Sequence, residues 1–262
     1  MSQTIQETKE LIEQSLVSFH EELARIGTSE KKDLLTAERK CPALLDDAFK
    51  LQFLRTDLFN PQLAACRFVL YWKNRVQLFG PEKAFLPMTL DGAMKDDIDM
   101  LSKGFIRLLP GEARVFWIES SRFCAKTDDV RSVARCVWYT QSQALAESPE
   151  MQKMGAVFVL DVGHQVDGRS RSLCDSISQA LMDVFPLRFQ KLYVVNAPLL
   201  IHTICNVFKL LLKPCLRDRV KIYGQVPTKL EKKLGLAPHT LSAAHLDEWT
   251  VPPTTSRLVK TP

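Results

Sequence analysis

The chain has 262 residues, of which 46% are hydrophobic and 25% charged, and its 35 basic and 30 acidic residues give a formal charge of +5. These values are typical of a globular protein with one large domain or two smaller ones. Basic and acidic residues are interleaved, so the sequence shows no concentrated basic patch for nucleic acid. The ten glycines form neither a GxGxxG nor a Walker pattern. No stretch reaches the ~18 uninterrupted apolar residues of a membrane span.

The N-terminal third predicts helices. The opening stretch MSQTIQETKELIEQS lacks the apolar core of a secretory signal, and its glutamates argue against a mitochondrial transit peptide. Helical spacing continues to Gly27, and residues 41–59 predict a second apolar helix. Asn60 is a suitable N-cap for a third helix that begins at Pro61 and ends at Gly80, in which Tyr71 and Trp72 are predicted to pack between lobes. We therefore expect an all-helical lobe over residues 1–82.

The seven cysteines predict free thiols. They form no CxxC pair and show no Cys/His spacing of a metal site, so we expect no structural zinc, no other metal and no cofactor. Several lie among apolar residues, where cysteine behaves as a small hydrophobe. This usage fits a reducing, cytoplasmic location.

After Glu112 the pattern changes to alternating strands and helices. Strands are predicted near 113–118, 156–162, 190–196 and 219–223, and helices in SVARCVWYTQSQALAE and SLCDSISQALMDVF. Such alternation indicates βαβ units and a largely parallel sheet. Residues 236–262, rich in proline, serine and threonine, predict a partly disordered C-terminal tail.

One segment is unusually apolar for a chain in which 25% of the residues are charged. NAPLLIHTICNVFKLLLK (residues 196–213) predicts a helix that is apolar on nearly every side. Such a helix must be buried on both faces or meet lipid. An apolar cavity on one side and a membrane on the other would satisfy this requirement.

A larger block around this helix resembles the CRAL-TRIO family of lipid-binding and lipid-transfer proteins, which includes phosphatidylinositol-transfer and tocopherol-transfer proteins. FPLRFQKLYVVNAPLLIHTICNVFKLLLKPCLRDRVKIYG (185–224) carries a Phe-Pro-x-Arg segment, a strand ending in Val-Asn-x-Pro, and a strand ending at glycine. The matching positions are Phe185, Pro186, Asn196, Pro198, Lys209 and Gly224. Upstream, AVFVLDVG resembles the family's central strand and LQFLRTDLFNPQLA its N-terminal helix pair, so the resemblance covers about residues 45–224.

The resemblance implies an α/β fold. An N-terminal all-helical lobe (1–82) would be followed by a mainly parallel β-sheet with flanking helices enclosing an apolar cavity (83–235). It also implies a carrier rather than an enzyme. The protein would bind a single small hydrophobic ligand or lipid and transfer or present it between membranes through a mobile apolar gate helix.

The same resemblance suggests which residues would touch the ligand and the membrane. The expected ligand-binding residues are Phe158, Leu160, Ile177, Leu181, Phe185, Leu192, Val194, Ile204, Val207, Phe208 and Leu211. Lys209, Lys213 and Arg219 would lie near headgroups, including those of anionic lipids. The expected partners are thus a hydrophobic small molecule or lipid and, transiently, a membrane surface, with no nucleic acid.

Departures from the family pattern leave the ligand open. The family's Lys-Pro-Phe-Leu turn is Lys209 followed by three leucines here. The two basic positions that help hold the inositol phosphate in the phosphatidylinositol branch are Asp57 and Leu58. Positions of the basic cleft in the tocopherol branch are Gln190, Cys215 and Arg219, of which one is basic.

Two alternatives belong to other functional classes. The chain could be a CRAL-TRIO-like adaptor that binds no ligand. It could also be a small α/β enzyme around Asp161 and His164, which follow a buried strand where α/β enzymes often keep catalytic groups. An acid–base pair would further need a nucleophile and an oxyanion site, and the sequence presents no such set.

Overall fold

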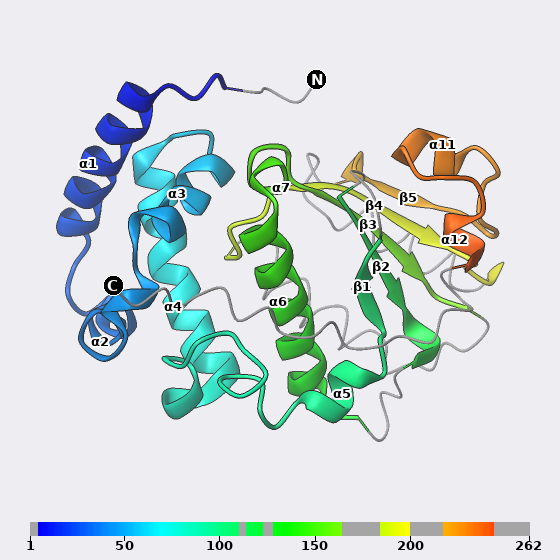
Figure 1. Cartoon of the computed structure of the whole chain (residues 1–262), viewed down its shortest axis with the longest axis horizontal. Helices are drawn as coiled ribbons and strands as arrows, with labels where there is room; N and C mark the ends of the chain where they lie inside the picture. The colour runs from blue at the N-terminus through cyan, green and yellow to red at the C-terminus, as the bar shows by residue number, and fades with distance from the viewer. Residues whose placement is uncertain (1–4, 110–113, 123–127, 164–183, 200–216, 244–262) are drawn as a thin grey trace.

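The helical lobe and the sheet lie at opposite sides of the molecule, with a long central helix between them (Figure 1). The computed structural model describes residues 5–109, 114–122, 128–163, 184–199 and 217–243. The element order begins with the helices of the lobe, continues through the sheet and ends in two short helices on the far side of the sheet.

The lobe comprises four α-helices and one 3-10 turn among the described residues. These are α1 (Lys9–Arg25), α2 (Lys32–Lys40), η1 (Pro42–Leu44), α3 (Asp47–Thr56) and α4 (Pro61–Lys83). Side chains cap three of the helices, since Thr8, Asp46 and Asn60 each accept a hydrogen bond from the backbone N–H three residues later. The prediction of a helical N-terminal region is confirmed.

Two local differences from the predicted helices have clear causes. Residues 41–59 do not form one helix, because Pro42 opens a 3-10 turn and the Asp46 side chain starts a new helix at Asp47. Gly80 has φ 80° and ψ 167°, outside the helical region, so regular helix ends there as expected. A short helical turn begins at Pro81 and continues α4 to Lys83.

The sheet has the strand order β1-β2-β3-β4-β5. Its strands are β1 (Ile106–Leu108), β2 (Val115–Glu119), β3 (Ala156–Asp161), β4 (Phe189–Val195) and β5 (Val220–Ile222). β2 to β5 are parallel to one another, which confirms the prediction of a largely parallel sheet. β1, which the sequence analysis did not predict, is only three residues long and pairs antiparallel with β2.

The other elements lie before, between and after these strands. They are α5 (Ile98–Ser102), η2 (Ser120–Arg122), α6 (Val130–Glu147), α7 (Pro149–Met154), α11 (Leu230–Leu234) and α12 (Thr240–Ala243). Gly155 joins α7 to β3 with φ 78°, and a Cβ there would lie 2.2 Å from the Arg188 carbonyl oxygen, so only glycine fits. The predicted helices at 172–185 and 199–212 fall almost wholly outside the described residues.

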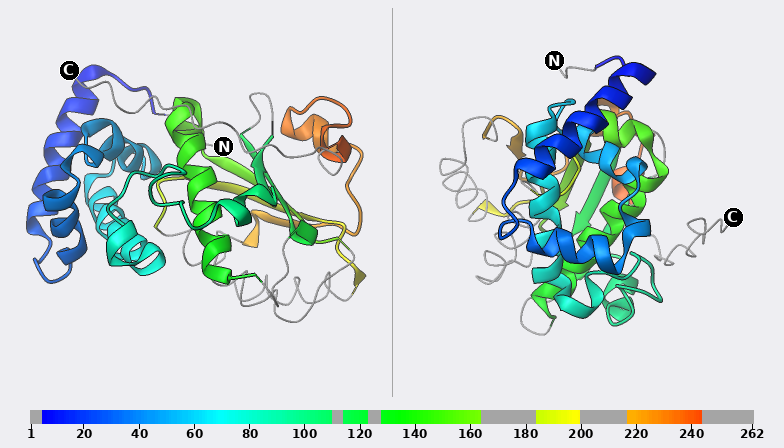
Figure 2. Two further views of the ribbon diagram at one scale, coloured as in Figure 1. Left: turned by 60° about the horizontal axis from the view of Figure 1, so that its bottom comes forward. Right: turned by 90° about the vertical axis from the view of Figure 1, so that its left-hand side faces the viewer.

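The two faces of the sheet contribute to different hydrophobic cores. Phe116 and Phe158 lie on the face that packs toward α6 and the helical lobe (Figure 2). Trp117, Val159 and Tyr193 lie on the opposite face. Leu230, Leu236 and Leu241 from the α11–α12 layer cover that face. Residues 236–243 thus belong to this layer, while the rest of the predicted tail, 244–262, lies outside the described residues.

Aromatic rings join the lobe to the sheet domain. The Tyr71 ring of α4 lies 4.9 Å from the Trp138 ring of α6 and 6.2 Å from the Phe185 ring, measured between centroids. This confirms the prediction that Tyr71 packs between lobes. Trp72 is fully buried and stacks on Phe85 at 6.1 Å.

Candidate functional site

Four of the predicted ligand-binding residues share one face of the sheet. In the parallel register of β3 and β4, Phe158 lies beside Leu192 and Leu160 beside Val194. Because alternate residues of a strand point to the same face, all four side chains lie on the face opposite Trp117 and Tyr193. The sheet side of the predicted cavity is therefore continuous and apolar.

The packing of this face changes along the sheet. The Phe158 ring stacks between Phe116, at 5.1 Å, and Phe189, at 5.8 Å, and joins the edge of the main core. Leu160 and Leu192 are half-buried, and Val194 is buried. None of these three belongs to either hydrophobic core of the described residues. We call Leu160, Leu192 and Val194 the apolar strip.

Other predicted site residues lie elsewhere or outside the described part. Phe185 is buried against Trp138, 5.1 Å between ring centroids, in the core between the lobes. Arg219 is exposed and donates from Nη1 to the Phe189 carbonyl at 2.8 Å. The following lie outside the described residues: His164, Ile177, Leu181, Ile204, Val207, Phe208, Lys209, Leu211 and Lys213.

A polar cluster closes the carboxyl edge of the sheet beside the apolar strip. Asp161, at the end of β3, is buried, and its Oδ1 accepts from Asn196 Nδ2 at 3.1 Å and from the Gly163 N–H at 3.0 Å. Ser120 Oγ lies 2.9 Å from the carbonyl oxygens of Asp161 and Val162. These hydrogen bonds hold the ends of β2, β3 and β4 together. The side-chain contact between Asp161 and Asn196 lies at the centre of the cluster.

This cluster explains the Val-Asn-x-Pro pattern in physical terms. Asn196 has φ 53°, a left-handed conformation that asparagine tolerates better than most residues. The turn directs the chain away from the sheet while the side chain reaches back to Asp161. The carboxylate oxygen that accepts these bonds therefore has a structural role. No group of three metal-ligating side chains occurs within the described ranges.

Arg188, of the Phe-Pro-x-Arg segment, lies near the boundary with the helical lobe. Burial lowers the pKa of its guanidinium, and the negative charge of Asp57 opposes that effect. Asp57 is held by Arg67, whose Nε and Nη2 each donate at 2.8 Å. Asp57 thus occupies a family headgroup position but is engaged in an ion pair with a neighbouring helix.

Two ion-pair clusters connect elements that are far apart in the sequence, and neither was predicted. Arg55 donates to both carboxylate oxygens of Glu7, at 2.9 and 2.8 Å, and to Gln152 Oε1 at 2.5 Å. These contacts connect the segment before α1 with α3 and α7. The matched sequence LQFLRTDLF contained Arg55, but a contact over 97 residues has no local sequence pattern.

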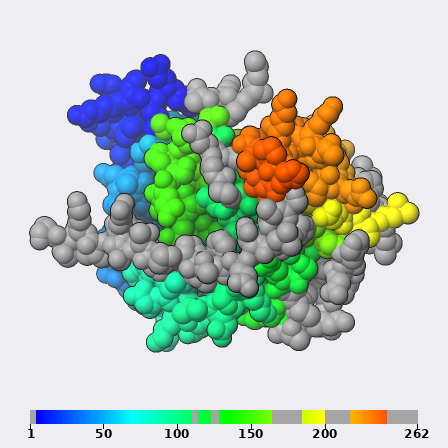
Figure 3. All heavy atoms as spheres, turned by 45° about the vertical axis from the view of Figure 1, so that its right-hand side comes forward, coloured from blue at the N-terminus to red at the C-terminus, as the bar shows by residue number. Residues whose placement is uncertain are grey.

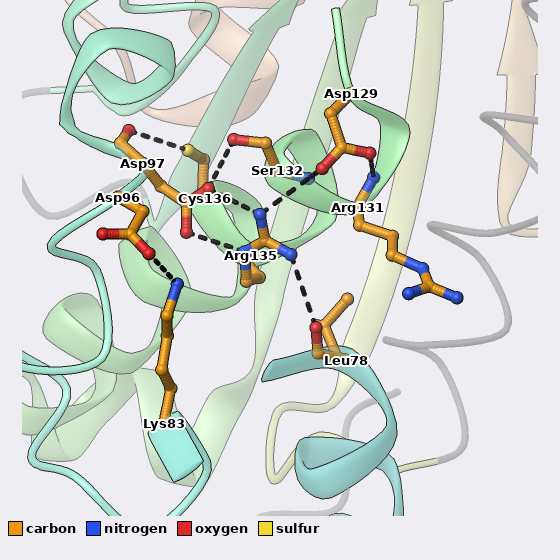
Figure 4. Close-up of polar contacts among 9 residues, drawn as sticks. All are labelled: Leu78, Lys83, Asp96, Asp97, Asp129, Arg131, Ser132, Arg135 and Cys136. Atoms are coloured by element: carbon orange, nitrogen blue, oxygen red, sulfur yellow. Dashed lines mark hydrogen bonds and ion pairs between the residues drawn. The ribbon is translucent and has the colours of Figure 1, made fainter. Parts of the chain in front are cut away.

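The second cluster surrounds Asp97 (Figure 4). Arg135 of α6 donates to both carboxylate oxygens of Asp97 at 2.7 Å, and Ser132 Oγ donates to Oδ1 at 2.6 Å. The hydrogen bond to Asp97 is the main reason that the pKa of Arg135 is raised. Cys136 follows Arg135 on α6. Burial raises the pKa of the Cys136 thiol, so the thiol stays protonated.

A surface depression of about 520 Å³ lies in the helical lobe and not beside the apolar strip. It is lined mainly by the end of α1, the turn after it and the start of α4, including Arg25, Gln62 and Cys66. Its lining includes Glu22, Arg25 and Glu30, and these charges do not suit an apolar lipid. No helix within the described ranges is long and apolar enough to cross a membrane.

Together, the helical lobe and the mainly parallel five-stranded sheet form an α/β fold. Residues 111–237 match the CRAL/TRIO domain family. This match confirms the resemblance to the CRAL-TRIO family that the sequence shows.

Similar proteins agree with this assignment. The chain is 28% identical over 187 residues to Clavesin-2 of Rattus norvegicus and of Homo sapiens, covering 68% of this chain and 55% of theirs. It is 27% identical over 201 residues to an alpha-tocopherol transfer protein-like protein of Pongo abelii, covering 72% and 56%. The chain thus spans about half the length of the curated relatives it matches. The crystal structure of Sfh5 shares the fold, with a TM-score of 0.51 at 11% identity over 87% of this chain and 85% of that one.

Proposed function

We propose that the protein binds one hydrophobic small molecule or lipid in a cavity against the apolar strip and transfers or presents it between membranes. The observation that carries this proposal is the strip itself: Leu160, Leu192 and Val194 are contiguous on one sheet face and belong to neither described core. The CRAL/TRIO domain and the tocopherol transfer protein-like relative support a lipid as the occupant.

The segment that follows β4 is the proposed gate. The sequence of residues 199–212 predicts a helix that is apolar on nearly every side, and this segment follows Asn196, whose side chain is hydrogen-bonded to Asp161. The gate would cover the cavity with one face and meet the bilayer with the other when it opens. At about 0.8 kcal/mol per buried CH₂, a long acyl chain crosses water very slowly by itself, and a carrier removes that barrier.

We propose a carrier rather than an enzyme. Asp161, the carboxylate around which a catalytic site could be imagined, is buried and hydrogen-bonded to Asn196 and to the Gly163 N–H. A general acid or base must reach a substrate proton. An oxygen that holds two strand ends together is poorly placed for that role.

Native mass spectrometry of the purified full chain tests the carrier function directly. We expect a protein species with one added lipid mass, which solvent extraction releases and identifies. After delipidation, the protein should take up NBD-labelled phosphatidylcholine or α-tocopherol with one-to-one stoichiometry. A protein that carries no lipid and takes up neither probe would instead be a ligand-free adaptor.

A further inference from the structure

The positive charge of the chain is concentrated at one end of the molecule. Residues 189–199 and 217–243 hold seven Lys and Arg but two Asp and Glu, a formal charge of +5, which equals the total charge of the chain. The remainder is therefore nearly neutral. β5, α11 and α12 gather beside the end of β4 on the side away from the helical lobe, as the orange and yellow surface in Figure 3 shows.

Five lysines of this end form what we call the basic face: Lys191, Lys221, Lys229, Lys232 and Lys233. Three of them surround Tyr193. Lys221 lies beside Tyr193 in the register of β4 and β5, and Lys191 precedes it by two residues on the same sheet face. Lys233 Nζ lies 5.8 Å from the Tyr193 ring centroid.

The backbone that carries these lysines packs on the second hydrophobic core. Tyr193 is buried and stacks on Tyr223, with 6.3 Å between centroids and 15° between ring planes. Leu230 anchors α11 to the same core, with Lys229 at its N-cap and Lys232 and Lys233 within the helix. The segments from which these lysines extend are therefore held against the sheet.

The charges of the basic face are not neutralised within the described part of the chain. None of its five lysines forms an ion pair there, whereas Lys50, Lys83 and Lys153 elsewhere each pair with a carboxylate. Glu231 is the acid of α11, and its carboxylate accepts from the backbone N–H groups of His239 and Leu241 at 2.9 and 2.8 Å. It is thus committed to holding α12 and not to pairing with the lysines.

We propose that the basic face binds the anionic surface of a membrane. Lysine is depleted at protein–protein interfaces, where exposed aromatic and arginine anchors dominate. Here the aromatic residue at the centre, Tyr193, is buried beneath the lysines. Separate, hydrated ammonium groups suit a diffuse layer of anionic headgroups. Each lysine near such a surface contributes about fivefold (about 1 kcal/mol) to binding.

Membrane docking through the basic face would serve the proposed carrier function. Its biological purpose rests on that function, but the binding itself does not. It contains none of Lys209, Lys213 and Arg219, the headgroup residues that the family resemblance suggests. It also lies on the sheet face opposite the apolar strip, because Tyr193 and Leu192 alternate. Ligand binding and docking through this face are therefore separable by mutation.

The experiment uses the full chain and vesicles of phosphatidylcholine with 0 or 30% phosphatidylserine at 0.1 M salt. The test variant carries Lys221→Gln, Lys229→Gln and Lys232→Gln, all at exposed positions. The matched control carries Lys9→Gln, Lys32→Gln and Lys73→Gln, which are exposed on the helical lobe. Both lose three charges, and a urea melt shows whether each remains folded.

We expect the test variant to lower the partition coefficient onto phosphatidylserine vesicles by about 100-fold, and the control by less than threefold. Uptake of NBD-labelled phosphatidylcholine should be equal in all three proteins. Equal losses in both variants would show that net charge alone matters and would overturn the proposal. Wild-type protein that binds heparin or an acidic polypeptide but not these vesicles would overturn it as well. Failure of NBD-lipid uptake in the wild type would instead count against the carrier function.

Discussion

Asn196 Nδ2 lies 3.1 Å from Asp161 Oδ1, and this hydrogen bond joins the carboxyl ends of two neighbouring parallel strands at the point where the chain leaves the sheet. The contact combines a side-chain donor with a backbone conformation, φ 53°, that few residues tolerate. Both features can be removed separately.

Asn196→Gly removes the donor but keeps the left-handed backbone accessible, so we expect a loss of about 1 kcal/mol in the free energy of unfolding. Asn196→Ala removes the donor and also strains the backbone, so the loss should be larger by about another 1 kcal/mol. Urea unfolding followed by circular dichroism measures both. Equal effects of the two substitutions would show that the backbone conformation carries no cost.

The Glu7–Arg55 pair predicts a pH dependence of stability. Burial alone would raise the pKa of the Glu7 carboxyl. The hydrogen bonds and charge of Arg55, aided by Lys153, outweigh burial and lower the pKa below its usual 4.5. A carboxylate with a lowered pKa stabilises the fold above its unfolded pKa, and this stabilisation is lost as the pH falls through the folded pKa.

Glu7→Gln should therefore cost about 2 kcal/mol of unfolding free energy at pH 7, and the difference from wild type should shrink as the pH falls below about 4.5. Urea melts at pH 7, 5 and 4 provide the measurement. Glu13→Gln is the control, because the Glu13 side chain is 65% exposed and its pair with Lys9 spans 3.8 Å. A pH-independent cost at Glu7 would contradict the prediction.

Arg135 should be among the most sensitive charged residues, because its partner Asp97 is only 1% exposed. Arg135→Met leaves that carboxylate buried without its cation, and we expect a loss of about 3–5 kcal/mol. Adding Asp97→Asn should recover more than half of the loss. Arg131→Met, on the same helix but exposed and pointing away from Asp97 in Figure 4, should change stability by less than about 0.5 kcal/mol.

Leu160 and Val157 test which sheet face holds the ligand. Both are half-buried on β3, three residues apart, and point to opposite faces. Leu160→Gln places a polar group in the apolar strip and should lower uptake of NBD-labelled phosphatidylcholine at least tenfold. Val157→Gln should leave uptake within twofold at a similar cost in stability. Uptake that falls equally in both variants would mean that general destabilisation, and not the strip, limits binding.

The proposed gate predicts a different dependence on charge from that of the basic face. Lys209→Ala, Lys213→Ala and Arg219→Ala together should slow lipid transfer between anionic vesicles more than they weaken ligand binding, and added salt should slow wild-type transfer similarly. Fluorescence dequenching measures the transfer rate. If neither the triple change nor salt alters that rate, the gate docks through its apolar residues alone.

Much of this architecture was predictable because it depends on local patterns. The Asn60 cap, the helix end at Gly80 and the four parallel strands follow from short-range rules on caps, glycine and apolar runs. β1 was missed because three residues, one of them the buried Arg107, are too few to show alternation. The break before Asp47 was missed because the apolar pattern continues across it.

The candidate site was predictable only in part. Strand alternation placed Phe158, Leu160, Leu192 and Val194 on one face, and the structure has them there. Sequence could not reveal that Phe158 and Phe185 already have aromatic neighbours, since Phe116 and Trp138 are distant along the chain. The basic face was likewise hidden, because its lysines come from two strands and a helix, and the +5 total conceals their concentration.

The ring contact between Tyr71 and Trp138, at 4.9 Å, bears on how the chain can be divided. Phe68, Tyr71 and Phe79 of α4 belong to the same hydrophobic core as Phe116 and Trp138 of the sheet domain. A fragment limited to residues 111–237 would expose this aromatic surface to water and should aggregate. The intact protein should melt in a single cooperative transition, with calorimetric and van't Hoff enthalpies in agreement. The region that carries the family pattern is thus smaller than the unit that folds.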